Sequence, residues 1–455
     1  MKVIASFKNK SFVHEDHDRA WLDALTTNST VLMDADTFDR NGRRPFPNRF
    51  NIVVVPQGRD VVCDDQTNNL EFVDETKLDH IVADIDGLIG EDVYVIGGPD
   101  LHRRFVGKAT LVHAAVLPPP SSAEAKSRET FFFPTEHMHS YEILDASSSS
   151  EPTVVITYQK TARKHGECQY LEMLRRILLH GEARPDRTGT GTLAIFGHQL
   201  RFDISRSVPF LTTKALAWKT VVKELLWFLS GSTDSKVLES QGVSIWKANT
   251  SRAFLDARGL GGYREGDVGP LYPHALRSFG AEYAGCDQRG AGFDQLSALI
   301  AGLKSDPYSR RHVMTTFDPS VVDKCVLMPC HGIAIQFYVN GDPGGAGLSC
   351  HVYCRSSDSF LGLPFNIASY AVLTYLIAKL CGMKPNELVV STGDTHVYAN
   401  HVEQVKAQLT RSPLPFPVLV VSDDVLAKPI EEVTLDDFRL KGYVSHSAIP
   451  APMAV

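Results

Sequence analysis

The first third of the sequence predicts an α/β domain that is separate from the rest of the chain. Up to residue 158, short runs of β-branched and aromatic residues alternate with segments of helical spacing, which is the pattern of a sheet with connecting helices. A polar, basic segment at residues 159–165 then predicts a connection between domains. Because 455 residues exceed the usual size of one domain, we expect domains at residues 1–158 and 166–455.

The elements of this first domain are expected to be short. We expect a helix at residues 18–25 and strands at residues 3–5, 31–33, 51–55, 93–96, 111–116 and 154–158. Two Ser-rich stretches, at residues 121–129 and 146–152, predict loops.

The remainder of the chain predicts longer helices. Apolar residues recur at helical spacing within residues 170–179, for which Gly181 is a suitable stop, and within residues 217–229. The apolar segment at residues 367–381 contains Ser, Thr and Lys and is too short to span a bilayer, so it predicts a buried helix opened by Asn366. We also expect a loop at residues 356–366 and strands at residues 326–327, 333–339 and 348–355.

Composition indicates an ordinary globular protein of a reducing compartment. Hydrophobic residues make up 43% of the chain and charged residues 22%. The net charge of −7 argues against general affinity for DNA. The 8 cysteines are scattered and no apolar leader precedes them, so we expect free thiols, no membrane partner and a cytoplasmic location.

Cys330, between Pro329 and His331, has two possible interpretations. A lone cysteine is most often a small buried hydrophobic residue. It can also be a nucleophile, which requires a lowered pKa and some access. His331 and the pair Arg310–Arg311 could supply the positive charge that lowers the pKa of a thiol.

Two further features bear on this choice. The Gly/Thr-rich segment 186–192 carries Arg187, and such a loop can surround a phosphate with N–H groups and a guanidinium, although an ordinary turn has the same composition. Glu224 lies on the apolar face of the 217–229 helix, between Val221 and Phe228. A carboxylate there indicates either a buried ion pair or a proton-transfer group with a raised pKa.

A metal site is not expected. Strand alternation over residues 348–355 places Cys350 and Cys354 on one face and His351 on the other. No second Cys/His pair has the spacing of a zinc site.

The first domain resembles the dihydrofolate reductases. The resemblance is carried, in the order and spacing of that family, by Ala20-Trp21, Val31-Leu32-Met33, residues 44–53 (RPFPNRFNIV), Val95-Ile96-Gly97-Gly98 and residues 130–134 (TFFFP). Asp18 falls where the family has its substrate-protonating carboxylate, and Asp18 and Arg49 would mark the folate side of the domain.

The departures from that family concern the nicotinamide cofactor. The loop after the first strand is shorter than in the family and lacks its Pro-Trp pair. Asp34 and Asp36 stand where the family meets the cofactor phosphate with Gly and a basic residue, and carboxylates repel phosphate. Pro99 interrupts the glycine turn and removes an N–H donor. We expect that the domain keeps the fold but neither binds NADPH nor acts as a reductase.

The second domain resembles the thymidylate synthases, nearly without gaps, from residue 166 to residue 455. The runs that carry the resemblance are residues 186–192 (DRTGTGT), 209–214 (PFLTTK), 224–228 (ELLWF), 266–272 (GDVGPLY), 329–331 (PCH), 360–370 (FLGLPFNIASY), 393–398 (GDTHVY) and 452–455 (PMAV). The resemblance implies an α+β fold and the reductive methylation of dUMP to dTMP with 5,10-methylenetetrahydrofolate as co-substrate. The whole chain resembles the fused dihydrofolate reductase–thymidylate synthases of protists and plants.

The resemblance also implies roles for the catalytic residues. Cys330 matches the nucleophile, because C6 of a uracil is only weakly electrophilic and needs a thiolate. Glu224 matches the carboxylate that organises water and proton transfer, and Tyr272 a residue that helps to remove the C5 proton. Asn366 matches the group that reads the uracil edge, because an amide accepts from N3–H and donates to O4. Asp358 matches the pterin contact.

The ligand contacts implied by the resemblance form two sets. The residues that match dUMP contacts are Arg187, Arg310, Arg311, His331, Arg355, Ser356, Asn366, His396 and Tyr398, of which Arg310 and Arg311 would cross the interface of a homodimer. The residues that match folate contacts are Lys214, Ile245, Trp246, Asn249, Asp358, Leu361, Gly362, Phe365, Met453 and Val455. The terminal carboxylate of Val455 would close the site and exclude water.

Several residues near these positions depart from the synthase pattern. They are Ala215, Lys247, Leu276, Phe317, Asp318 and Cys354. Substitutions that support catalytic groups lower rates, so we expect an active synthase that can be slow. Three alternatives remain open: a fully bifunctional enzyme, a non-catalytic scaffold, and a deoxycytidylate hydroxymethylase. Asn366 argues against the hydroxymethylase, because the cytosine edge suits Asp.

Overall fold

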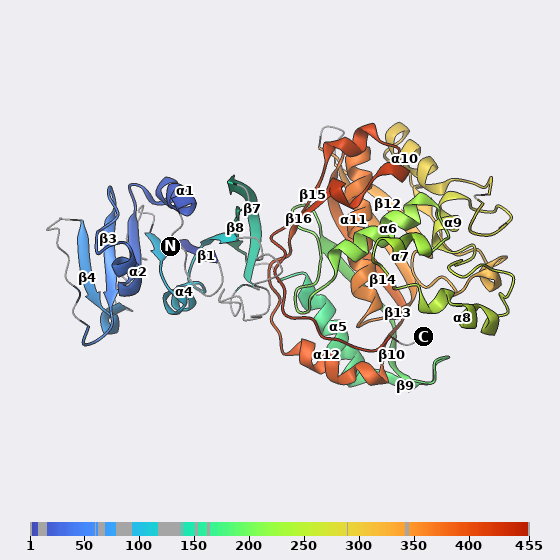
Figure 1. Ribbon diagram of the computed structural model, residues 1–455, viewed down its shortest axis with the longest axis horizontal. Coiled ribbons are helices and arrows are strands. Elements are labelled where there is room, and N and C mark those ends of the chain that lie inside the picture. The colour runs from blue at the N-terminus through green and yellow to red at the C-terminus, as the bar shows by residue number, and fades with distance from the viewer. Residues whose placement is uncertain are drawn as a thin grey trace. The chain divides into compact units, whose positions relative to one another are not determined.

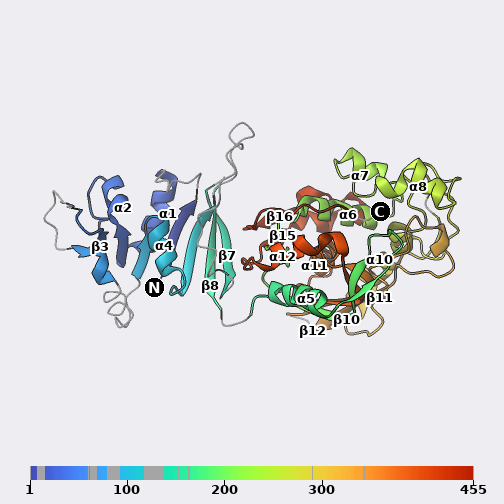
Figure 2. The same ribbon diagram turned by 90° about the horizontal axis from the view of Figure 1, so that it is seen from below.

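The computed structural model describes residues 2–7, 16–59, 61, 69–78, 93–116, 138, 140–150, 153–161, 164–288, 290–341 and 345–453. Contacts divide the chain into two compact units, Met1–His165 and Gly166–Val455, and each is built on its own sheet (Figures 1 and 2). Three sequence-based expectations lie outside the described residues: the loop at 121–129, the run at 130–134 and the role of Val455.

The first unit is an α/β unit, as expected. Its helices are α1 (Asp16–Thr26), α2 (Ala35–Arg40) and α4 (Pro99–Phe105). Its strands are β1 (Lys2–Phe7), β2 (Thr30–Asp34), β3 (Phe50–Val55), β4 (Leu70–Asp74), β5 (Val93–Ile96), β6 (Leu111–Val116), β7 (Tyr141–Ser150) and β8 (Thr153–Lys160). In the described residues they form one sheet in the order β4-β3-β2-β5-β1-β6-β8-β7. Neighbours from β4 to β6 are parallel, and β8 is antiparallel to β6 and β7.

Two strands of this sheet, β4 and β7, were not predicted. The expectation of a loop from residue 146 is wrong, because β7 runs to Ser150 and pairs with β8, as in Ser148 opposite Val154. Strand β7 is at the edge of the sheet, where backbone pairing with β8 can hold a strand whose residues have low β-propensity. Strand β8 continues to Lys160, two residues into the expected connection.

The second unit combines long helices with a mixed sheet. Its helices are α5 (Glu167–His180), α6 (Trp218–Ser230), α7 (Lys236–Ser240), α8 (Arg252–Ala257), α9 (Tyr272–Arg277), α10 (Gln295–Ser305), α11 (Gly362–Leu380) and α12 (Val402–Leu409). Its strands are β9 (Glu182–Arg184), β10 (Thr192–Asp203), β11 (Val313–Met314), β12 (Ala334–Asn340), β13 (Gly347–Asp358), β14 (Lys384–Tyr398), β15 (Val418–Val421) and β16 (Phe438–Lys441). Among the described residues the main sheet has the order β11-β12-β13-β14-β10-β9, and β15 pairs with β16.

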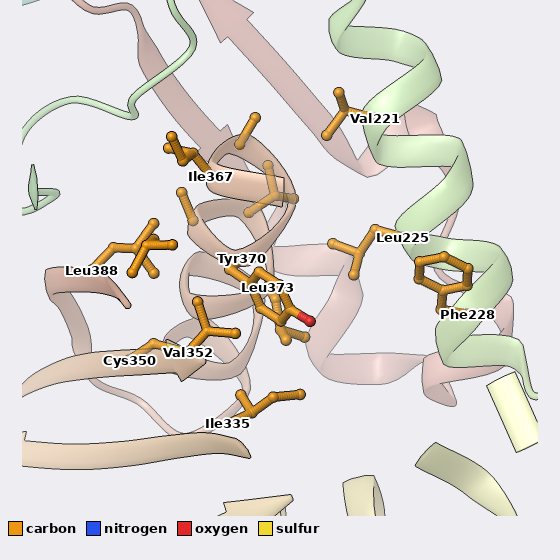
Figure 3. Close-up of a cluster of buried hydrophobic side chains, with 14 of the residues drawn as sticks. Val221, Leu225, Phe228, Ile335, Cys350, Val352, Ile367, Tyr370, Leu373 and Leu388 are labelled. Carbon is orange, nitrogen blue, oxygen red and sulfur yellow. The ribbon is translucent and has the colours of Figure 1, made fainter. Parts of the chain in front are cut away.

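Helix α11 forms the centre of this unit. It packs on β13 and β14, and its other side contacts α6. Figure 3 shows Ile367, Tyr370 and Leu373 of α11 between the strand residues and the α6 side chains Val221 and Leu225. The helix begins at Gly362, before the expected segment, and with 19 residues it is long and apolar enough to cross a membrane by length and composition alone. Its side chains are nevertheless buried within the unit, as predicted.

Near the residues that are expected to form the site, three sequence-based expectations differ from the structure. Residues 326–327 form a bend rather than a strand. Strand β13 continues through Asp358, beyond the expected loop boundary, because β14 pairs with it as far as His396 opposite Asp358. Because α11 begins at Gly362, Asn366 lies in its second turn rather than at its start. This extension of β13 places residues 355–358 beside the end of β14.

Candidate active site

Cys330 lies in the segment before β12 and is held from two sides. Its Sγ is 3.4 Å from the Tyr272 hydroxyl, which also accepts a hydrogen bond from the Cys330 N–H at 3.0 Å. From β13, the Ser356 N–H donates to the Cys330 carbonyl at 3.3 Å, and Arg355 Nε donates to the Pro329 carbonyl at 3.2 Å. Burial raises the pKa of the Cys330 thiol, while the Tyr272 hydroxyl and the Arg355 guanidinium oppose that shift. Arg355 is therefore a cation of the same chain that acts on the charge of this half-buried thiol.

His331 supports this arrangement without carrying a charge. Its ring stacks on Tyr272 with centroids 4.2 Å apart and an interplanar angle of 18°, and its Nδ1 is 2.8 Å from the Tyr370 hydroxyl. Burial lowers the pKa of His331 to about 4. The expectation that His331 supplies positive charge to the thiol is therefore wrong at neutral pH. Gly332 follows at φ +66°, and a Cβ there would collide with the Tyr370 hydroxyl.

Glu224 lies among aromatic rings, as its place on α6 predicted. Trp246 Nε1 donates to Glu224 Oε1 at 2.8 Å, and the Trp246 ring lies 5.9 to 6.4 Å from the rings of Trp227, Phe228 and Tyr272. Burial raises the pKa of Glu224 to about 7, and the bond from Trp246 opposes the shift. A carboxyl group with that pKa can both accept and donate a proton near neutral pH.

Lys214 and Asp358 meet at the turn between β13 and α11. Asp358 Oδ1 accepts hydrogen bonds from the N–H groups of Phe360 at 3.0 Å and Leu361 at 3.1 Å. Lys214 Nζ donates to the Phe360 carbonyl and lies 3.5 Å from the centroid of its ring. Burial lowers the pKa of Lys214 to about 8, and Asp358 opposes the shift. Lys214 is thus bonded within the chain, under the turn that carries the expected folate contacts.

The expected phosphate loop is organised around its own carboxylate. Asp186 accepts hydrogen bonds from the N–H groups of Thr188 at 2.9 Å and Gly191 at 2.7 Å. Of the two interpretations of this segment, these bonds favour the ordinary turn for the N–H groups of Thr188 and Gly191. Arg187 is exposed, so its guanidinium is the part of the loop that can meet an anion.

The end of β14 completes one wall of the site. His396 Nδ1 is 2.8 Å from Asp394 Oδ1, and the His396 and Tyr398 rings meet edge to face at 5.2 Å. Because Ser356 pairs with Asp394 and Asp358 with His396, the parallel strands bring the expected phosphate, pterin and ribose contacts together.

The remaining predicted residues lie around this centre. Asn249 is buried, Ile245, Asn366, Leu361, Gly362 and Phe365 are half-buried, and Met453 is exposed. Arg310 and Arg311 are exposed in the turn before β11. Of the residues that depart from the synthase pattern, Leu276 and Cys354 are buried, Phe317 and Asp318 are half-buried, and Ala215 and Lys247 are exposed.

Sequence reasoning missed two supporting groups, Tyr370 and Asp394. Both stand inside the runs that carry the synthase resemblance, but Tyr370 was taken as part of an apolar helix. Its hydroxyl bond to His331 spans 39 residues, and a hydroxyl on an otherwise apolar helix face was the available signal.

In the first unit, the position expected to meet a cofactor phosphate is occupied by Asp34. Its carboxylate accepts hydrogen bonds from the N–H groups of Thr37, at 2.8 Å, and Gly98. A Cβ at Gly97 or Gly98 would press on the same carboxylate, so the glycine turn encloses Asp34. The N–H groups of Thr37 and Gly98 therefore already donate to an anion of the chain itself.

The expected folate side of the first unit also contains an internal ion pair. Arg49 is buried, and its Nη2 lies 2.6 Å from Asp23 Oδ1. Asp18 lies within α1.

Comparison with known proteins agrees with both parts of this description. A family model for dihydrofolate reductase matches residues 4–163, and one for thymidylate synthase matches residues 168–455. The thymidylate synthase of Equine herpesvirus 2 is 49% identical over 293 residues, which cover 64% of this chain and 99% of that protein. The thymidylate synthase of Homo sapiens is 46% identical, with 64% and 91% covered.

A longer match covers both units. The bifunctional dihydrofolate reductase-thymidylate synthase of Zea mays is 37% identical over an alignment 460 residues long, which covers 90% of this chain and 85% of that protein. The chain therefore belongs to the thymidylate synthase family, with a domain of the dihydrofolate reductase family in front.

Proposed function

We propose that the chain is a thymidylate synthase that converts dUMP and 5,10-methylenetetrahydrofolate into dTMP and dihydrofolate. The observation that carries the proposal is the contact between Cys330 and Tyr272, next to the aromatic cluster whose Trp246 bonds to Glu224, a carboxyl group whose pKa is raised by burial. The test is release of tritium from C5-labelled dUMP on addition of the folate, with dCMP as competitor. If dCMP suppresses tritium release as strongly as unlabelled dUMP does, the result would favour a hydroxymethylase instead.

The chemistry can be followed with the residues of this chain. The Cys330 thiolate forms a bond to C6 of the uracil, and the electron pair moves through C5 towards O4. Glu224 would then handle a proton at that oxygen, directly or through water. C5 then forms a bond to the folate methylene as the bond from that carbon to N10 breaks. The Tyr272 hydroxyl takes part in removing the C5 proton as the remaining bond from the carbon to N5 breaks, which leaves an exocyclic methylene on C5. Hydride from the folate reduces the exocyclic carbon to methyl as the C6–S bond breaks.

We propose that the enzyme is a homodimer formed by the open face of the main sheet. On β12, Gln336 and Tyr338 point away from the core, and Tyr338 is 60% exposed. With Gln199 and His351 they line a groove of about 340 Å³ on this face. Exposed aromatic side chains on a sheet face are typical of an interface. A second copy would also bring Arg310 and Arg311, which would add the positive charge that burial of Cys330 requires.

A mixing experiment tests the shared site. Cys330→Ala and the double variant Arg310→Ala/Arg311→Ala should each be inactive, but a reassorted mixture should recover activity. Half of the dimers are then mixed, and each has one complete site of two, so ~25% of the wild-type rate is expected. The control is each variant reassorted with itself, which should stay inactive. A mixture without activity would place the arginines and Cys330 of one site on the same chain.

For the first unit we propose a fold that no longer works as a reductase. The support is the Asp34 carboxylate in the phosphate position. Isothermal titration of the full chain with NADPH should give no binding heat at micromolar concentrations, whereas dUMP should give heat in the same sample. Micromolar NADPH binding would reinstate the bifunctional alternative. We also propose a cytoplasmic location, which the scattered cysteines favour.

A further inference from the structure

Residues 444–453 form a segment without helix or strand that lies on the synthase unit, which we call the C-terminal strap. Two of its contacts lie near its start. The His446 N–H donates to the Thr212 carbonyl at 2.8 Å, and Arg411 donates to the Ser447 carbonyl at 2.7 Å. Further along, Ile449 and Ala451 pack on the hydrophobic core.

The last described contact of the strap is made by a histidine. His401 Nε2 lies 2.7 Å from the carbonyl of Pro452, and the His401 side chain is fully buried. Because a carbonyl only accepts, Nε2 carries the proton and donates this bond. The other ring nitrogen, Nδ1, is buried without a hydrogen-bond partner among the described residues.

His401 also contacts two walls of the site. Its ring lies 5.6 Å from the ring of Tyr398, the expected ribose contact, and 5.5 Å from the ring of Phe360. Lys214 Nζ in turn lies over the ring of Phe360 and donates a hydrogen bond to the Phe360 carbonyl. The short helical turn Ala399–His401 is also tied to the Arg187 loop, because the Ala399 N–H donates to the Gly191 carbonyl at 2.9 Å.

We propose that His401 is a positioning residue that fastens the C-terminal strap over the folate side of the pocket and couples its seating to Phe360 and Tyr398. The inference rests on the proposed synthase function and assigns His401 no contact with the reacting atoms. A strap held at Pro452 excludes water from the reaction. When the hydrogen bond is lost, the strap opens more often, and the folate is held less well.

The experiment uses the full chain and three substitutions of His401. His401→Leu removes the donor and puts an apolar side chain in its place. Because Nδ1 has no hydrogen-bond partner among the described residues, this substitution removes no second hydrogen bond. His401→Gln keeps an N–H that can reach Pro452, and His401→Asn is polar but too short. We expect kcat/KM for 5,10-methylenetetrahydrofolate to fall about fivefold to tenfold in the Leu and Asn variants and to recover in the Gln variant. The dissociation constant of dUMP should change less than about twofold.

The matched control is His446→Leu, because His446 bonds the same strap to the body, through Nε2 and the Ser412 carbonyl at 2.8 Å. It should leave kcat/KM for the folate unchanged. An equal loss in His446→Leu and His401→Leu would reduce the effect to general loosening of the strap and overturn the proposal. Wild-type kinetics in His401→Leu would overturn it as well. If His401→Leu does not fold, the proposal is tested by the ratio of kcat/KM for the folate between the Gln and Asn variants. An inactive wild-type chain would instead contradict the synthase function itself.

Discussion

Replacing Cys330 by alanine should abolish the release of tritium from C5-labelled dUMP, with a loss of about 10⁴-fold or more. Without the thiolate, C6 receives no nucleophile, so C5 never becomes electron-rich and its hydrogen does not exchange. The cavity left by one sulfur is small, and the Cys330 N–H and carbonyl bonds to Tyr272 and Ser356 do not depend on the side chain. The variant should therefore fold, and its affinity for dUMP should largely persist.

The control for this prediction is Cys381→Ala, which removes a half-buried thiol at the end of α11. It should retain nearly full activity and a thermal unfolding midpoint close to that of Cys330→Ala. Retained tritium release in Cys330→Ala would contradict the assignment of the nucleophile. Equal loss in both variants would indicate a general requirement for thiols rather than a reaction at Cys330.

The sequence predicted those parts of the site that depend on local periodicity. Glu224 could be placed on an apolar face because residues three and four apart meet on a helix, and Trp246 then provides its bond. The alternation of β13 likewise predicted one face for Cys350 and Cys354, which are both buried, and the other face for His351, which is exposed. The length of β13 could not be predicted in the same way, because it is set by pairing with β14 far along the chain.

Other features could not be predicted because their partners are distant in sequence. Lys214 meets Phe360 across 146 residues, so its role as a support under the folate turn has no local signal. The charge of His331 depends on burial of its ring, which contacts Tyr272 and Tyr370 from distant parts of the sequence. Asp34 shows the opposite case. Its negative charge alone argued against phosphate binding. The structure adds that its carboxylate accepts the hydrogen bonds of the nearby N–H groups.

Replacing Glu224 by glutamine should lower dTMP formation about 10²- to 10³-fold, because an amide cannot exchange a proton at the uracil oxygen. The amide oxygen can still accept the Trp246 bond, so dUMP binding should change far less than the rate. The wild-type rate should show a pH limb with a midpoint near the Glu224 pKa of about 7. The measurement is kcat from pH 5.5 to pH 9 for both proteins. A limb that persists in Glu224→Gln would assign it to another group.

The same pKa has a consequence for stability, and its sign follows from linkage. The folded chain holds the Glu224 proton more tightly than the unfolded chain, so stability falls as pH rises from about 4.5 to the folded pKa of about 7. Above pH 7 the ionised, buried carboxylate costs roughly 3 kcal/mol that a glutamine does not. Glu224→Gln should therefore gain stability relative to wild type between pH 5 and pH 8 in urea unfolding of the synthase unit. A difference that stays constant with pH would mean that Glu224 is ionised in the folded chain throughout. Its place among aromatic rings would then serve ligand binding rather than proton transfer.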